Sequence, residues 1–84
     1  MFVKYFRDER LECQVLFKTL EKLTGEFPDL VIRTFETENG YVSVFKEEGD
    51  IKTIPTLKFI SETKGLVSVL EHFPTEEEII SILN

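Results

Sequence analysis

The chain has 84 residues, of which 42% are hydrophobic and eight are phenylalanine, and this composition predicts one small globular domain over residues 1–84. Its 16 Asp and Glu residues outnumber its 10 Lys and Arg residues, and the net charge of −6 argues against nucleic acids and anionic membranes as partners. Because the chain has one cysteine, no signal-peptide pattern at its start and no apolar run long enough to span a bilayer, we expect a cytoplasmic protein without internal disulfides.

The first part of the chain predicts a strand followed by a helix. Residues 2–6 are mostly aromatic or β-branched, which is typical of a strand. From Arg10 the apolar residues recur with helical spacing and define one buried face: Cys13, Leu16, Phe17, Leu20 and Leu23. Asp8 and Glu9 precede this face, where an N-cap and a first helical turn favour carboxylates. Gly25 is the expected end of the helix.

The middle of the chain predicts a second strand and a short second helix. Residues 30–37 partly alternate in polarity, as in a strand. Asn39-Gly40 is a turn signal and is compatible with a hairpin. The apolar residues of segment 41–49 have helical spacing instead, although its two valines favour extended backbone. We therefore predict a short helix that ends at Gly49.

The last part predicts a hairpin and a final helix. Residues 56–61 and 66–70 read as two strands joined by the turn E-T-K-G at 62–65. Thr75 and Glu78 have the T-x-x-E spacing of a capping box, so a helix begins after Thr75. The predicted order is β-α-β-α-β-β-α, an α/β fold in which the first two strands are parallel and the last two antiparallel.

This order and two short motifs resemble the thioredoxin/glutaredoxin family. Residues 51–57, I-K-T-I-P-T-L, resemble the I-R-G-I-P-T-L stretch of thioredoxins, in which the proline follows a cis peptide bond. Residues 5–13, Y-F-R-D-E-R-L-E-C, resemble the F-W-A-x-W-C-x-x-C stretch that enters the active-site helix. The resemblance implies a minimal thioredoxin-like fold, with a four-stranded mixed sheet and helices on both faces. It also implies a cis bond between Ile54 and Pro55.

The motif that carries the family's redox chemistry is altered in this chain. R-L-E-C stands in place of C-x-x-C, so Arg10 occupies the position of the attacking cysteine and Cys13 that of the second. Disulfide exchange needs a thiolate that attacks and a thiol that resolves the mixed disulfide. A guanidinium does neither, so the resemblance implies that the paired-cysteine chemistry is lost.

Cys13 and Arg10 each have two interpretations. The helical spacing favours Cys13 as a small buried apolar residue. The alternative is a monothiol that Arg10 helps to ionise, which would act as a glutaredoxin-like thiol–disulfide oxidoreductase or become glutathionylated. Arg10 either pairs with Glu9 or Glu12 at the surface or contacts an anion at the helix N-terminus. The nearby carboxylates oppose an anion there.

The resemblance also implies a peptide-binding groove. In the family, the backbone edge before the cis-proline binds an extended peptide by strand-like hydrogen bonds. Carried over to this chain, the groove residues are Arg10, Ile54 and Pro55, with His72 near its border. Without the resemblance, Pro55 only begins a strand, where proline is tolerated.

The function that this pattern favours is a redox-inactive domain that binds a protein or peptide, as a monomer and without a cofactor. The alternative is a monothiol enzyme of cell redox homeostasis that acts through Cys13 as its catalytic residue and uses glutathione. His72 is the only histidine and has no Cys/His cluster around it, so we expect no metal site.

Overall fold

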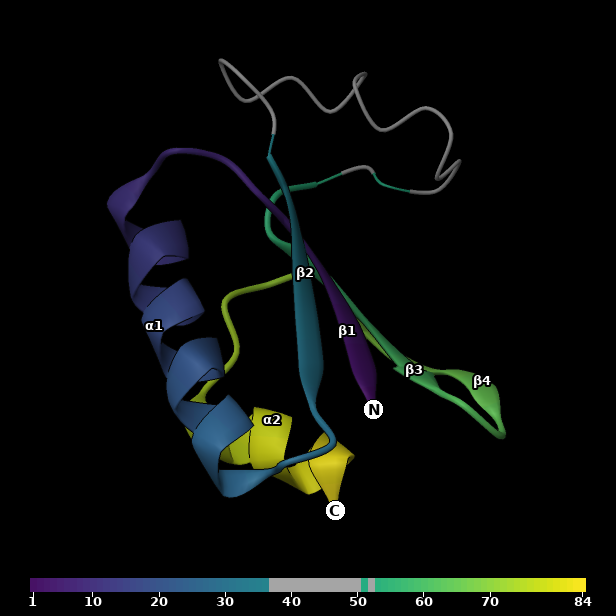
Figure 1. Ribbon diagram of the computed structural model, residues 1–84. Helices are drawn as coiled ribbons and strands as arrows, with labels where there is room; N and C mark the ends of the chain where they lie inside the picture. The colour runs from purple at the N-terminus through teal and green to yellow at the C-terminus, as the bar shows by residue number, and fades with distance from the viewer. Residues whose placement is uncertain (37–50, 52) are drawn as a thin grey trace.

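The strands form one mixed sheet with helices packed against it (Figure 1). The computed structural model describes residues 1–36, 51 and 53–84. The described elements are β1 (Phe2–Arg7), α1 (Leu11–Glu26), β2 (Val31–Glu36), β3 (Thr56–Ser61), β4 (Gly65–Leu70) and α2 (Glu76–Leu83). This order confirms the predicted α/β fold class, with element ends shifted by one or two residues. The helix predicted at 41–49 lies outside the described residues.

The sheet has the strand order β2-β1-β3-β4. β1 and β2 are parallel, and β3 is antiparallel to both β1 and β4, as the chain pattern predicted. Phe6 near the end of β1 pairs with Thr56 at the start of β3, and Leu57 pairs with Leu70 at the end of β4. The segments that follow β1, precede β3 and follow β4 therefore meet at one end of the sheet.

The main core lies between one face of the sheet and the two described helices. Side chains alternate between the two faces of a strand, so every second residue of β1 and β3 points at the helices. The buried cluster combines these positions with the predicted apolar face of α1, Leu30 just before β2 and one residue of α2: Val3, Tyr5, Cys13, Leu16, Leu20, Leu23, Leu30, Leu57, Phe59 and Ile79. Within the described residues, neither helix is long and apolar enough to cross a membrane.

The opposite face of the sheet carries a second, smaller cluster. Phe6 and Ile51 are buried there, with Phe35 and Ile54 packed against them. The rings of Phe6 and Phe35 stack with their centroids 4.9 Å apart. Since α1 and α2 both pack on the first face, the prediction of helices on both faces depends on segment 41–49, which is not among the described residues.

The start of α2 confirms the predicted capping box. The Thr75 hydroxyl accepts a hydrogen bond from the Glu78 backbone N–H at 3.2 Å, and the Glu78 carboxylate accepts one from the Thr75 N–H at 3.1 Å. Lys22 of α1 also pairs with Glu76 at 2.8 Å. These contacts fix where α2 begins and tie it to α1.

We expect Thr75→Ala to lower the free energy of unfolding by about 1 kcal/mol, because it leaves a helical N–H without its acceptor. Urea denaturation followed by circular dichroism measures this change. Thr19→Ala is the matched control, since the Thr19 hydroxyl bonds only to the Val15 carbonyl within α1. A control change as large as that of Thr75→Ala would contradict the capping role.

Candidate functional site

The candidate site begins where the chain leaves β1 and enters α1. Arg10 is the N-cap of α1, and its side chain makes no capping hydrogen bond. The prediction that Asp8 and Glu9 serve as N-cap and first turn is therefore wrong, since both precede the N-cap. Asp8 acts differently: its Oδ1 accepts the Arg10 backbone N–H at 3.0 Å, a turn-forming bond to the second residue along the chain.

The Arg10 guanidinium forms a hydrogen-bonded ion pair with the Asp8 carboxylate. Nη2 lies 2.7 Å from Oδ2, and Nε lies 3.1 Å from Oδ1 and 3.0 Å from Oδ2. The pairing predicted with Glu9 or Glu12 is wrong, because the turn at Asp8 brings that carboxylate nearest. Burial acts to raise the pKa of Asp8, but the hydrogen bonds from Arg10 outweigh it and hold the pKa below its ordinary value. The hydrogen bond between the two side chains also raises the pKa of Arg10.

Cys13 lies beneath this ion pair and is fully buried. Its Sγ donates to Asp8 Oδ1 at 3.4 Å, and the Tyr5 hydroxyl donates to the Cys13 carbonyl at 2.7 Å. Burial raises the pKa of the thiol, and the Asp8 carboxylate adds to this because its charge disfavours a thiolate. Burial likewise raises the pKa of Tyr5. The arrangement keeps the thiol protonated, which disfavours it as a nucleophile.

Sequence reasoning did not find the roles of Asp8 and Tyr5. The available signal was an aspartate two residues before the helix, a spacing at which its side chain often accepts a backbone N–H. The sequence places Tyr5 in a strand and in the motif of residues 5–13, but its hydrogen bond depends on how α1 packs on β1.

The predicted groove residues Ile54 and Pro55 lie just before β3. The peptide bond between them is cis. Pro55 is buried and Ile54 is half-buried. Because Thr56 pairs with Phe6, the bond lies at the sheet end where α1 begins.

His72, the fourth predicted groove residue, follows β4 at this same sheet end. Its ring is exposed, with Nε2 3.0 Å from Glu78 Oε2. The hydrogen bond from the Thr75 backbone N–H is the main cause that holds the pKa of Glu78 below its ordinary value, and the contact with His72 adds to this effect. The topology thus brings Arg10, Ile54, Pro55 and His72 to one end of the sheet, although Arg10 contacts Asp8 and His72 contacts α2.

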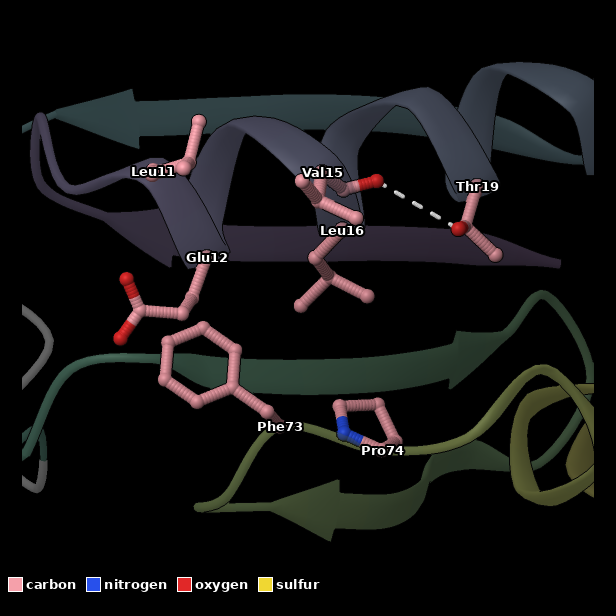
Figure 2. Close-up of a pocket in the computed structure, with 7 residues that line it drawn as sticks. All are labelled: Leu11, Glu12, Val15, Leu16, Thr19, Phe73 and Pro74. Atoms are coloured by element: carbon pink, nitrogen blue, oxygen red, sulfur yellow. Dashed lines mark hydrogen bonds between the residues drawn. The ribbon is translucent and has the colours of Figure 1, made fainter.

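An apolar groove lies beside this end of the sheet, between α1 and the segment that joins β4 to α2 (Figure 2). It has a volume of about 360 Å³ and contains none of the four predicted residues. Its lining comprises Leu11, Glu12, Val15, Leu16, Thr19, Phe73 and Pro74, and we call it the α1–Phe73 groove. Figure 2 shows the Phe73 ring turned towards the Glu12 and Leu16 side chains.

Two apolar side chains of α1 that line this groove are open to solvent. Leu11 is 69% exposed and Val15 is 56% exposed, and they lie four residues apart on α1, away from its buried face. That spacing was the signal that sequence reasoning missed. Among the described residues, no group of His, Cys, Asp and Glu side chains is placed to hold a metal ion.

Comparison with known proteins identifies the architecture. No protein-family model and no curated protein matches the sequence. Thioredoxin 1 from Thermosipho africanus superposes with a TM-score of 0.76 at 14% identity, covering 99% of this chain and 90% of that one. For oxidised thioredoxin O2 from Arabidopsis thaliana the TM-score is 0.78 at 17% identity, covering 98% and 70%. The chain has a thioredoxin fold.

A third structure agrees with this assignment. Thioredoxin f2 from Chlamydomonas reinhardtii superposes with a TM-score of 0.70 at 20% identity, covering 99% of this chain and 75% of that one. The resemblance seen in the two sequence motifs is thus confirmed as a resemblance of fold. At these identities the likeness concerns the thioredoxin fold, and the chemistry must be argued from the residues of this chain.

Proposed function

We propose that this chain is a redox-inactive binding domain with a thioredoxin fold, which holds an extended segment of a protein partner. The observation that carries the proposal is the state of Cys13, its only cysteine. That thiol is buried and donates a hydrogen bond to Asp8, and its pKa is raised. Arg10, which stands where the family resemblance implies the attacking cysteine, is held in an ion pair. Neither group supports disulfide exchange.

The proposed binding surface combines the predicted site with the α1–Phe73 groove. Leu11 follows Arg10 in the chain and Phe73 follows His72, so the groove continues from the sheet end that carries the predicted residues. The backbone beside Ile54 offers strand-like hydrogen bonds to an extended segment. The groove offers space for an apolar side chain of that segment.

Charge defines the second feature of the proposed partner. Glu12 lines the groove, and Glu9 and Glu71 are exposed close to it in the chain. The positive charge of Arg10 is balanced by Asp8. We therefore expect the bound segment to carry a basic residue next to its apolar anchor.

Selection from a random peptide library tests this function. We expect the selected peptides to combine an apolar and a basic residue, and to bind at least about tenfold more weakly to Phe73→Ala or Leu11→Ala. The control is Val31→Ala, which removes an exposed apolar side chain from β2, outside the groove. Fluorescence anisotropy gives the affinities. Peptides that bind all variants equally would contradict the proposed surface.

A disulfide-reduction assay distinguishes the alternative function. With insulin as substrate and dithiothreitol as reductant, we expect the protein to add nothing to the uncatalysed rate, since Cys13 is not accessible. Catalysis that is lost in Cys13→Ser would instead establish the monothiol oxidoreductase.

A further inference from the structure

One wall of the α1–Phe73 groove is a short connecting segment. Residues 71–75 join β4, which ends at Leu70, to α2, which begins at Glu76. Phe73 and Pro74 line the groove from this segment, and Figure 2 shows both side chains on the side of the groove opposite α1. Phe73 is 37% exposed and lies outside the buried core. The contacts that fix this segment therefore decide the shape of the groove.

One carboxylate binds the chain on both sides of Phe73 and Pro74. Glu78 Oε1 accepts a hydrogen bond from the Thr75 backbone N–H at 3.1 Å. Glu78 Oε2 lies 3.0 Å from Nε2 of His72. The first bond belongs to the capping box, and a capping box requires no histidine. The second bond is therefore additional, and it closes this stretch into a loop that is held at both ends.

The two residues between these contacts have little freedom of their own. The ring of Pro74 fixes its φ close to about −65°. Proline also restricts the residue before it, here Phe73, to extended backbone. A wall that is ordered before binding avoids the entropic cost of becoming ordered on binding. The segment is thus preorganised by its proline and by the two bonds to Glu78.

The contact between His72 and Glu78 does not require a charged ring. It requires a hydrogen on Nε2, which the protonated ring and one neutral tautomer both carry. The pKa of Glu78 lies below its ordinary value, chiefly because of the Thr75 backbone hydrogen bond, so the carboxylate is ionised at neutral pH and accepts both bonds. Both side chains are exposed, so the effect of this contact is on local order rather than on global stability.

We propose that His72 and Glu78 are positioning residues of the α1–Phe73 groove, which together hold Phe73 and Pro74 in place before a partner binds. The sequence predicted His72 as a binding residue at the border of a groove, and in this proposal it acts through Glu78 instead. The inference rests on the proposed function, because it concerns the groove that receives the partner's apolar side chain.

Backbone amide relaxation, measured by NMR on the free protein, tests the positioning. We expect the order parameter of the Phe73 N–H to be about 0.85 in the wild type and to fall towards about 0.6 in His72→Ala. His72→Gln restores it, because the glutamine amide places an N–H donor near the position of Nε2. Glu77→Ala is the matched control, since Glu77 is exposed in the same turn of α2 and takes part in neither bond.

The same measurement separates local positioning from a general loss of structure. In His72→Ala the capping box persists, so the order parameter of the Ile79 N–H stays at its wild-type value. A Phe73 N–H that stays near about 0.85 in His72→Ala would overturn the proposal. So would a Phe73 N–H that is as mobile in His72→Gln as in His72→Ala.

The affinity of the library-selected peptides tests the consequence for binding. We expect these peptides to bind His72→Ala about three- to fivefold more weakly than the wild type, and His72→Gln and Glu77→Ala within about twofold of it. Equal affinities for the wild type and His72→Ala would overturn the role of this pair in recognition. If the wild type binds no peptide, the proposed function fails, and the order parameters still decide whether His72 and Glu78 hold the wall.

Discussion

A thiol reagent is expected to modify Cys13 of the folded protein about 10³-fold more slowly than Cys13 of the unfolded chain. The folded thiol is buried and protonated, so the reagent reaches it only after the region around α1 opens. In a domain of this size an opening that costs about 4 kcal/mol exposes the thiol in roughly one molecule in 10³. An aromatic disulfide reagent, followed by absorbance with and without urea, gives both rates.

The matched control moves the thiol two residues along the same helix. In the variant that combines Cys13→Ala with Leu11→Cys, the new thiol takes an exposed position at the start of α1. We expect it to react in the folded protein within about tenfold of its rate in urea. If Cys13 itself reacted this fast without urea, its burial would not protect it, and the monothiol interpretation would regain support.

Local patterns explain why much of the fold could be predicted. The buried face of α1 follows from the helical spacing of its apolar residues, and the start of α2 follows from the Thr75–Glu78 capping box. Both signals lie within a few residues of chain, so the sequence displays them directly. The signal for the hairpin of β3 and β4 is also local, because a short turn joins two strand patterns that are adjacent in the sequence.

The features that were not predicted depend on contacts between segments that are distant in the sequence, or on the order of the strands in the sheet. Three carboxylates surround Arg10 in the sequence, and only the turn between β1 and α1 selects Asp8 as its partner. Phe73 became part of a groove because the segment after β4 crosses beside α1, 58 positions after Val15 in the chain. The edge position of β4 follows from the strand order, which adjacent residues do not encode.

Asp8 is the residue on which the start of α1 depends most. Its carboxylate accepts from the Arg10 side chain, the Arg10 backbone and the Cys13 thiol. Asp8→Ala leaves these donors without their acceptor, so we expect the free energy of unfolding to fall by about 2–3 kcal/mol. Denaturation by urea at neutral pH measures this loss. A loss below about 0.5 kcal/mol, as for an ordinary surface substitution, would contradict the structural role.

The pH dependence of stability tests the charge of Asp8 separately from its shape. Its pKa in the folded protein lies below the ordinary value, so the folded state favours the ionised form. The resulting stabilisation is complete above the ordinary carboxyl pKa of about 3.9, and it is lost as the pH falls through the lower folded pKa. Asp8→Asn keeps the shape and removes the titration, so its stability should fall less steeply below about pH 4 than that of the wild type.

The exposed Asp29 provides the control for this loss of stability at acid pH, because Asp29→Asn removes a carboxylate without disturbing the Asp8–Arg10 pair. We expect Asp29→Asn to follow the wild-type curve and Asp8→Asn to depart from it. Arg10→Ala adds a third curve, since without the guanidinium the folded pKa of Asp8 rises towards its ordinary value and the loss of stability at acid pH becomes smaller than in the wild type. If the wild type and Asp8→Asn lose stability in parallel, Arg10 does not stabilise the Asp8 charge, and the ion pair contributes only shape to the start of α1.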